Sequence, residues 1–468
     1  MEMWSEVKLS ALAPGFRLDP EFYRPEFLAR EGELFHLPCV SLDRLAYVTD
    51  GEHGSVPYTA AGVRYLTAEN VRHGYIDITD VRYVDDWVNR RNARATVEAG
   101  NILISIKGTL GQIAVAEQWL PPANMNRDVA VIKIRSQQLK SEFLAAFLMS
   151  RFGQFQALRE GSGGVQQMIT LGRLRSIKIP LLNREAQNHI ESLWQGAAVR
   201  RNSARSLYTT AVQIIEEEFG LATINLNQSI GYEACVSEMS DKRRWDSEFY
   251  KAKYRHVIER VLKSTKTKVE KFIALRRVLS YLTNGHTPLH HDLAVGDVLF
   301  LTAEHVADFS LDFTTDKRIL RIHHETELAR TALREGDILV TIKGKVGNCA
   351  VVRNCPRAAN INQDVALVRL RNGIHPYFFA AWFNSLVGKQ LVEQRSTGGI
   401  NPFLGLGNLR GMPFPVIDQK EQQRIGNLVQ ETVEKASSAE RQASDLLENA
   451  KHRIEELIEQ GAASNGRD

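Results

Sequence analysis

Apolar residues near the end of the chain recur at alternating steps of four and three. Within Lys420–Gln460 this register comprises Ile425, Val429, Thr432, Ala436, Ala439, Ala443, Leu446, Ala450 and Leu457. Subtracting 235 from the first eight of these numbers, within Arg184–Leu221, gives Ile190, Trp194, Ala197, Arg201, Ala204, Tyr208, Ala211 and Ile215. A 3.5-residue apolar repeat is typical of coiled-coil helices. We therefore predict two long helices that pair with each other; the alternative is two surface helices packed on separate cores.

An internal repeat extends over the rest of the chain. YLTAENV at 65–71 returns as FLTAEHV at 300–306, ILISIKGTLG at 102–111 as ILVTIKGKVG at 338–347, and NMNRDVA at 124–130 as NINQDVA at 360–366. The offset stays at 235 or 236. A repeat this long indicates two whole domains rather than solenoid units.

Each half has the same predicted order of elements. Asn101–Ile106 alternates as a strand, Gly108–Gly111 as a turn and Gln112–Ala116 as a second strand, which together predict a hairpin. A polar loop over Asn124–Arg127 and another strand over Asp128–Arg135 follow. A helical apolar stripe comes next, comprising Phe143, Leu144, Phe147, Leu148 and Phe152, with Phe378, Phe379, Trp382 and Phe383 as its counterpart.

The fold class that these elements predict is α+β, a tandem duplication of two globular α/β domains, each followed by a long helix. The predicted boundaries are 1–183 for the first domain, 184–221 for its helix, 222–241 for a linker, 242–419 for the second domain, 420–461 for its helix and 462–468 for a disordered tail.

Composition sets broad limits on function. The chain has 468 residues, 43% of them apolar and 24% charged, with a net charge of +4. This balance is ordinary for a soluble protein, and the cytoplasm is the default location. No apolar run is long enough for a membrane span. The cysteines, Cys39, Cys235, Cys349 and Cys355, lack zinc-ligand spacing, so no metal site is predicted. A nucleic-acid-binding surface would have to come from the local placement of Lys and Arg.

The hairpin strand carries the most informative basic residues. Lys107 and Lys343 each stand at a strand end beside a Gly turn, where the backbone can approach a ligand closely. Further basic pairs lie two residues apart on one strand face, and such pairs suit phosphate contact. They are Lys133 with Arg135 and Arg369 with Arg371. The alternative for these four residues is a solvated basic face.

The following loops supply side chains that can form bidentate bonds with base edges. They are Asn124, Asn126 and Arg127 in the first half and Asn360, Asn362 and Gln363 in the second. Since Arg127 matches Gln363, the halves would read different bases. Asn124 and Asn360 have an equal alternative as turn-forming residues that bond their own backbone. Two Gly-Gly loops, at Gly163–Gly164 and Gly398–Gly399, suit a flexible or anion-accepting role. The turns at 49–53 and 283–286 each carry a His, interpreted as a surface residue.

No catalytic apparatus is evident. Gly344-Lys345 lacks the spacing of a phosphate-binding loop. Asn401-Pro-Phe403 matches part of an amino-methyltransferase motif, but the second Pro is missing and no Gly-rich turn precedes it. A duplicated chain without a catalytic site indicates a binding protein.

These features resemble the specificity subunit of a type I restriction-modification system. The resemblance rests on the strand-turn segments 101–108 and 336–344, on the Gly-Gly loops, and on the junctions from Pro180 to Ile190 and from Pro415 to Ile425. It covers nearly the whole chain.

The resemblance implies two target-recognition domains that read the halves of a bipartite, asymmetric DNA site. It implies that the helices pair antiparallel through Ile190, Trp194, Ala204, Tyr208, Ile215, Ile425, Val429, Ala439, Leu446 and Leu457. It also implies docking of two modification subunits that methylate adenine N6 with S-adenosylmethionine, and of restriction subunits that use ATP and Mg; this chain would bind no cofactor. The alternative is a protein-interaction adaptor or inhibitor of the same fold that does not read DNA.

Overall fold

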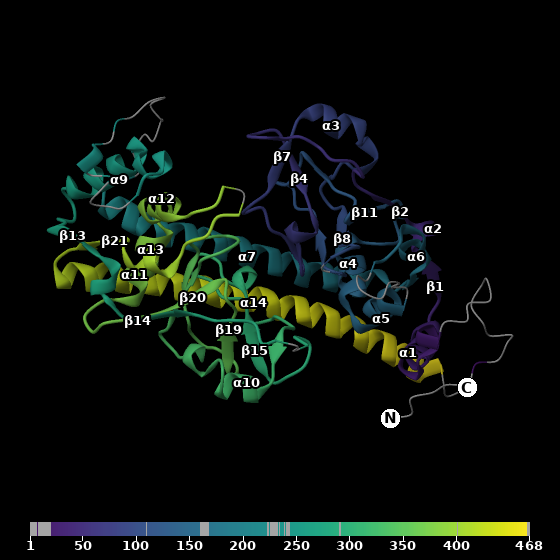
Figure 1. Ribbon diagram of the computed structural model, residues 1–468. Helices are drawn as coiled ribbons and strands as arrows, with labels where there is room; N and C mark the ends of the chain where they lie inside the picture. Colours follow the sequence, from purple (N-terminus) through teal and green to yellow (C-terminus); the bar gives the residue numbers. More distant parts are fainter. Residues whose placement is uncertain are drawn as a thin grey trace. The chain divides into compact units, whose positions relative to one another are not determined.

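The computed structural model describes residues 7, 20–108, 110–159, 168–221, 224, 233, 235–237, 239, 244–289, 292–399 and 401–465. The chain folds into two compact units (Figure 1). Unit 1 is Met1–Arg201 with Arg441–Asp468, and unit 2 is Asn202–Glu440. The long helices α7 (Arg184–Glu218) and α14 (Gln419–Asn465) each contribute residues to both units.

Unit 1 is built on two four-stranded sheets. The first has the order β2 (Ala46–Asp50), β11 (Val129–Ile134), β8 (Ile102–Ser105) and β9 (Ile113–Val115). The second has the order β10 (Ala123–Met125), β4 (Val63–Leu66), β7 (Arg82–Val84) and β3 (Tyr58–Thr59). Two-stranded sheets join β1 (Cys39–Ser41) to β12 (Lys178–Pro180) and β5 (Val71–Arg72) to β6 (Tyr75–Ile76). The helices are α1 (Pro25–Phe35), α2 (Leu42–Leu45), α3 (Asp86–Arg91), α4 (Ser141–Met149), α5 (Arg151–Arg159) and α6 (Leu171–Ser176).

Unit 2 repeats this arrangement. One sheet has the order β14 (Leu279–Asn284), β20 (Val365–Leu370), β17 (Ile338–Thr341) and β18 (Cys349–Val351). Another has the order β16 (Arg318–Ile319), β15 (Val298–Leu301) and β19 (Ala359–Ile361), and β13 (Lys271–Ala274) pairs with β21 (Pro413–Val416). The helices are α9 (Ala252–Leu262), α10 (Arg321–Glu325), α11 (Pro376–Asn384), α12 (Leu386–Arg395) and α13 (Leu406–Arg410). The mixed α/β architecture predicted from the sequence is confirmed.

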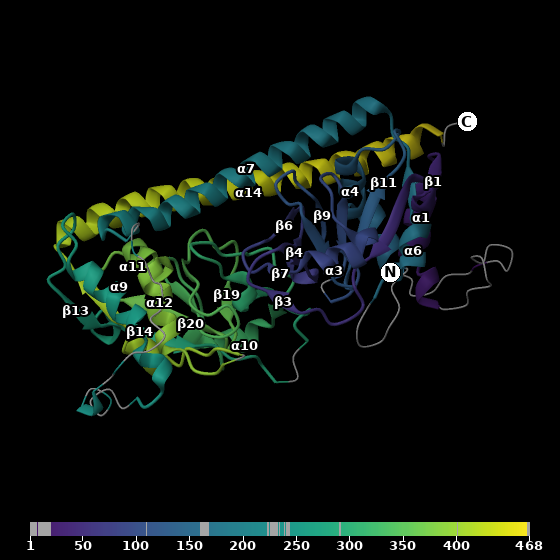
Figure 2. The same cartoon turned by 90° about the horizontal axis from the view of Figure 1, so that it is seen from above.

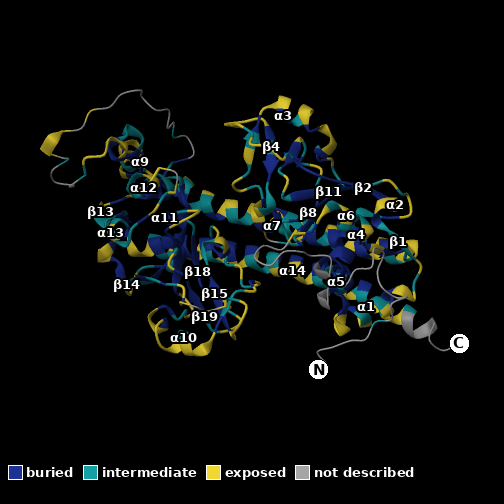
Figure 3. Ribbon diagram, turned by 45° about the vertical axis from the view of Figure 1, so that its right-hand side comes forward, coloured by how far each residue is buried: buried dark blue, intermediate teal, exposed yellow. Residues whose placement is uncertain are grey.

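Strand alternation distributes the core over both faces of the central sheet. Ile102, Ile104 and Ile106 join the cluster that contains the apolar stripe of α4. Leu103 faces the opposite side, with β4 and β10, in a second cluster. Because successive strand residues point to opposite faces, the predicted division of this strand is confirmed, as is the β8–β9 hairpin. Figure 3 shows these strands as buried and the ends of α3 and α10 as exposed.

Stretches of the two long helices share a core within each unit (Figure 2). In unit 1, Ile190, Trp194 and Ala197 cluster with Ala443, Leu447, Ala450, Ile454 and Ile458. In unit 2, Ala211 and Ile215 cluster with Ile425 and Val429, and Ala204 clusters with Ala436 and Ala439. The apolar repeat therefore marks the buried face of both helices.

The buried positions shift by one residue from the predicted register toward the end of α14. Leu446 and Leu457 are half-buried, with Leu446 packed against the core of unit 1, while Leu447, Ile454 and Ile458 are buried. An α-helix has 3.6 residues per turn, so a strict 3.5-residue register drifts around a straight helix, and the buried position moves by one residue. Tyr208 is also half-buried, and its hydroxyl donates to Glu440 at 2.8 Å. α14 continues to Asn465, into the segment 462–468 that the sequence assigns to a tail. The predicted linker 222–241 lies mostly outside the described residues.

Among the described residues, no helix has the length and apolarity needed to cross a membrane. Within the same residues, no group of three His, Cys, Asp or Glu side chains is placed to hold a metal ion.

Candidate nucleic-acid interface

The candidate site lies where two parallel strands end together. β4 and β10 pair in parallel with Leu66 opposite Met125, and β15 and β19 pair likewise with Leu301 opposite Ile361. Because parallel strands end at the same edge, the polar turns that follow them are brought side by side. The Asn126 N–H donates to Leu66 O at 3.0 Å, and the Asn362 N–H donates to Leu301 O at the same distance.

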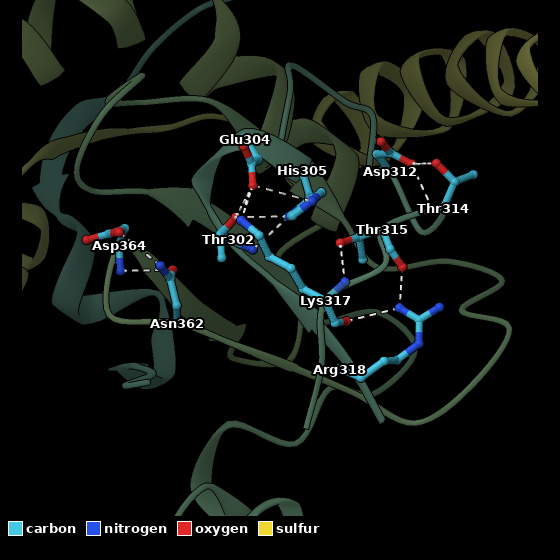
Figure 4. Close-up of polar contacts among 10 residues, drawn as sticks. All are labelled: Thr302, Glu304, His305, Asp312, Thr314, Thr315, Lys317, Arg318, Asn362 and Asp364. Atoms are coloured by element: carbon cyan, nitrogen blue, oxygen red, sulfur yellow. Dashed lines mark hydrogen bonds and ion pairs between the residues drawn. The ribbon is translucent and has the colours of Figure 1, made fainter. Parts of the chain in front are cut away.

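The first of these turns follows β4 in unit 1 and β15 in unit 2, and a side chain of the turn accepts a hydrogen bond from the turn's own backbone. In unit 1 the Thr67 N–H donates to Asn70 Oδ1 at 2.8 Å, and in unit 2 the Thr302 N–H donates to His305 Nδ1 at 2.9 Å. His305 is buried, and this burial lowers its pKa. The neutral ring, which can accept at Nδ1, is therefore favoured. Figure 4 shows Lys317 reaching across this turn to Glu304.

The second turn is an Asn-x-Asp ring with the same geometry in both units. The Asn126 amide donates to Asp128 Oδ2 at 2.9 Å and its Oδ1 accepts from the Asp128 N–H at 3.2 Å. Asn362 and Asp364 repeat these bonds at 2.9 and 3.1 Å (Figure 4). Both Asn side chains are thereby committed to the turn.

The middle residue of each ring, Arg127 or Gln363, is exposed. Of the residues predicted to read bases, these are the two whose side chains this edge exposes. The Gln363 Oε1 accepts from the Thr287 hydroxyl at 2.9 Å.

The turn at 49–53, whose His is interpreted from the sequence as a surface residue, also belongs to this edge. The Glu52 N–H donates to Met125 O at 2.9 Å, and Glu52 O accepts from the Arg127 N–H at 3.0 Å. The approach requires glycine, because a Cβ on Gly51 would lie 2.0 Å from Met125 O. The counterpart at Gly285 would lie 1.7 Å from Ile361 O. Sequence reasoning missed this role, although the Gly recurs within the duplication.

Each of these loops is joined to the segment after β7 or β16 by an ion pair. Glu52 Oε2 lies 2.8 Å from Arg91 Nη2 in unit 1, and Glu327 Oε2 lies 3.0 Å from His286 Nε2 in unit 2. Sequence reasoning also missed these residues. The available signal was that both pairs occupy equivalent positions of the repeat.

The strand-end lysines lie at the same edge. The Ile106 N–H donates to Asp128 O at 2.9 Å, which places Lys107 beside the Asn-x-Asp ring. Ile342 and Asp364 repeat this bond at 2.9 Å, and Lys343 Nζ lies 3.9 Å from Asp364 Oδ1. The Lys343 side chain is 57% exposed. The structure therefore brings Lys107 together with Arg127, and Lys343 together with Gln363.

The Gly-Gly loop of unit 2 is adjacent to Lys343. Thr397 and Phe403 exchange two backbone hydrogen bonds, at 2.9 and 2.8 Å, and enclose Gly398 and Gly399 between them. Gly398 has φ of +89°, a conformation that favours glycine. Phe403 also forms a β-bridge with Lys343. Gly163 and Gly164 lie outside the described residues.

Four of the predicted phosphate contacts lie elsewhere. Val129 is opposite Ser105 and Ile132 is opposite Ile102, so β11 runs away from the Lys107 edge. At about 3.3 Å per residue, a position four residues further along is ~13 Å from that edge. The residues placed at this distant end, in the two units, are Lys133, Arg135, Arg369 and Arg371.

Three of these four also have other contacts. The Arg369 guanidinium donates to both oxygens of Asp337, at 2.7 and 2.9 Å. The Arg371 Nε donates to Leu279 O at 3.0 Å, and the Arg135 guanidinium lies 4.9 Å from the centre of the Tyr47 ring.

The predicted polar loop at 124–127 is wrong for its first two residues, which belong to β10. Asn124 and its counterpart Asn360 are fully buried. Asn124 Oδ1 accepts from the Met125 N–H at 2.8 Å and from the Asn92 amide at 3.1 Å. The Asn360 amide donates to Leu328 O at 2.9 Å. A buried amide must have its hydrogen bonds satisfied internally, so these two side chains face the interior rather than a base edge.

Part of the chain is similar to a described family. Residues 33–192 match the family model of the type I restriction modification DNA specificity domain. Over 137 residues the chain is 27% identical to the type I restriction enzyme EcoBI specificity subunit of Escherichia coli. The aligned stretch covers 29% of this chain and 28% of that protein. The aligned part thus spans little more than a quarter of the relative.

Solved structures give a weaker likeness. The S subunit of a type I restriction-modification system from M. genitalium shares 14% identity, with 91% of this chain and 95% of that one covered and a TM-score of 0.36. The HsdS subunit from Thermoanaerobacter tengcongensis shares 13% identity, with 91% and 97% covered and a TM-score of 0.29.

Proposed function

We propose that this chain, whose residues 33–192 match the family model of the type I restriction modification DNA specificity domain, is the non-catalytic subunit that reads a bipartite, asymmetric DNA site. The globular domains at 1–183 and 242–419 would each read one half-site. The observation that carries the proposal is the duplicated edge, with a strand-end Lys, an exposed Arg or Gln and a glycine-dependent loop in each unit.

The side chains at this edge divide into two roles. Lys107 and Lys343 contact phosphates, since an ammonium on a strand end beside a Gly turn is accessible to a backbone oxygen. Arg127 and Gln363 contact bases. Arginine forms bidentate hydrogen bonds with guanine, and glutamine does so with adenine, so this pair makes the two half-sites different. Contacts from Lys133, Arg135, Arg369 and Arg371 would belong to a separate part of the DNA backbone.

The long helices pair with each other as an antiparallel coiled coil. The clusters described above support this proposal, because the beginning of α7 shares a core with the end of α14 in unit 1, and the reverse holds in unit 2. The outer faces of these helices dock two modification subunits, which methylate adenine with S-adenosylmethionine. Restriction subunits that use ATP and Mg join the same cytoplasmic complex.

DNA binding by lysine-to-glutamate variants tests this function. The full chain is titrated with duplex DNA at several salt concentrations. Each phosphate contact contributes about 0.9 to the slope of log affinity against log salt. We expect Lys107→Glu and Lys343→Glu each to weaken binding at least tenfold and to lower the magnitude of that slope by about one.

Lys178→Glu in unit 1 and Lys268→Glu in unit 2 are the matched controls, because both residues are exposed and belong to other elements, Lys178 to the β1–β12 sheet and Lys268 to the segment before β13. Equal DNA affinity for all four variants and the unaltered chain would refute the proposal and favour the adaptor hypothesis.

A further inference from the structure

Each strand-end lysine has an exposed apolar neighbour. Met168 forms an antiparallel β-bridge with Lys107, and Phe403 forms one with Lys343. The two apolar residues are 235 positions apart and therefore equivalent in the duplication. Met168 is 41% exposed and Phe403 is 43% exposed. The same unusual pairing of a cation with an exposed apolar side chain thus occurs in both units.

The backbone beneath these side chains is firmly held. The Ile169 N–H donates to Ile106 O at 3.0 Å, and the Leu404 N–H donates to Ile342 O at 2.9 Å. Ile169 and Leu404 are themselves completely buried. Because neighbouring residues of an extended segment point to opposite sides, burial of these two directs Met168 and Phe403 outward.

The surroundings indicate what covers these side chains. Fully burying a Met or Phe side chain is favourable by about 1.5–3 kcal/mol, so an apolar side chain held in solvent at a binding edge has affinity for a partner. The adjacent Lys343 side chain is 57% exposed, which favours an anionic partner. Double-stranded DNA combines a phosphate backbone with an apolar stack of bases, and proteins insert Phe and Met side chains between base steps.

We propose that Met168 and Phe403 are apolar base contacts, each inserted at a base step of its half-site while the neighbouring Lys107 or Lys343 binds the flanking phosphate. This inference rests on the proposed DNA-reading function and adds specificity-determining residues to it. The flat ring of Phe403 stacks against a base, whereas the thioether of Met168 adapts to the step that it enters. The halves then differ in this contact as they differ at Arg127 and Gln363.

Alanine variants of the full chain test the inference. The DNA is the target duplex identified by methylation mapping, with the base analogue 2-aminopurine placed at successive steps of one half-site. Phe403→Ala and Met168→Ala are expected to weaken specific binding about tenfold, in keeping with a lost stacking contact. The salt slope should stay unchanged, because no phosphate contact is removed, whereas Lys343→Glu should lower it. The unaltered chain should raise 2-aminopurine fluorescence at one step of each half-site, and the corresponding alanine variant should not.

Matched controls separate this contact from a general loss of apolar surface. Phe35→Ala and Leu262→Ala remove side chains that are 49% and 46% exposed at the ends of α1 and α9, and these variants should bind as the unaltered chain does. Phe403→Trp should retain binding, since it keeps a flat ring.

The outcomes are distinguishable. If the unaltered chain binds its target but Phe403→Ala and Met168→Ala bind it equally well, or if fluorescence does not rise, the insertion is refuted and the proposed function stands. If the unaltered chain does not bind DNA, both are refuted.

Discussion

The two units build the same edge with different charges. In unit 1 the loop supplies the acid, Glu52, and the segment after β7 supplies the base, Arg91. In unit 2 the loop supplies the base, His286, and the equivalent segment supplies the acid, Glu327. The neighbours differ as well: Arg91 lies 5.5 Å from the centre of the Trp87 ring, whereas the equivalent of Trp87, His323, forms a second ion pair with Glu327.

This difference separates residues that maintain the backbone from residues that face outward. Three positions that shape the strand end, the loop and the Asn-x-Asp ring are the same in both units. These are Gly51 with Gly285, Asn124 with Asn360, and Asn126 with Asn362. Two exposed positions differ, namely Arg127 against Gln363 and Met168 against Phe403, whereas the strand-end lysines Lys107 and Lys343 are the same. The duplication thus keeps these turns and the strand-end lysines and varies the other side chains that the edge exposes.

The glycines should give the largest effect. Gly51→Ala and Gly285→Ala place a Cβ within about 2 Å of a backbone oxygen, so the loop must move or the strand edge must open. We expect a loss of on the order of 3 kcal/mol or more in the stability of the affected unit, the scale of overpacked positions, measured by calorimetry.

Gly172→Ala and Gly399→Ala are the controls, because a Cβ at either position meets no described atom within 4 Å. Melting temperatures of the Gly51 and Gly285 variants that match these controls would contradict the assigned role of the close approach.

The buried asparagines should rank next. Asn124→Ala and Asn360→Ala leave buried partners without hydrogen bonds, which costs about 1–3 kcal/mol. Arg127→Ala and Gln363→Ala should leave the melting temperature nearly unchanged while altering which DNA is bound. If instead Asn124→Ala changed the recognised bases without loss of stability, Asn124 would be a reading residue.

The turn that Asn70 caps in unit 1 and His305 caps in unit 2 should respond differently to pH in the two units. Burial lowers the pKa of His305 below 6.5, against opposing effects of Glu304 and Asp312, while Lys317 acts in the same direction as burial. The unfolded state therefore binds the proton more readily. The contribution of the turn is complete above about pH 6.5 and is lost as pH falls toward the folded pKa.

We expect unit 2 to lose melting temperature between pH 7 and pH 5, and His305→Asn to reduce that loss, because Asn70 forms the same cap in unit 1. Asn70→His should introduce the dependence into unit 1. Identical pH profiles for the native and His305→Asn chains would show that this ring does not titrate with unfolding.

The loop ion pairs should have the smallest effect. Hydrogen bonds from the Gly54 N–H and then from Arg91 lower the pKa of Glu52, and those from His286 and His323 lower the pKa of Glu327. Both carboxylates therefore contribute stability above their unfolded pKa of about 4.5, and this is lost on acidification.

Glu52→Gln and Glu327→Gln should therefore each lower the melting temperature at pH 7, and the difference from the unaltered chain should shrink as the pH falls toward 4. A difference as large at pH 4 as at pH 7, measured by calorimetry, would show that the charge of these carboxylates does not stabilise the loops.

The sequence predicted the duplication, the hairpins, the long helices and the edge lysines, because each follows from periodicity or from repetition. It did not predict that Lys133 and Arg135 lie at the opposite end of the sheet from Lys107. That separation depends on the β8–β11 register, which brings Val129 opposite Ser105. Asn124 was ambiguous for a related reason, since only the parallel pairing of β10 with β4 decides that its side chain is buried.

Sequencing of methylated DNA tests the DNA-reading function most directly. Genomic DNA would be compared between cells that express this chain together with its methyltransferase and cells that express the methyltransferase alone. We predict a new adenine motif, split into two half-sites, that appears only with this chain and is weakened by Lys343→Glu. Absence of any new motif, although the two proteins form a stable complex, would contradict the assignment of this chain as the DNA-reading subunit.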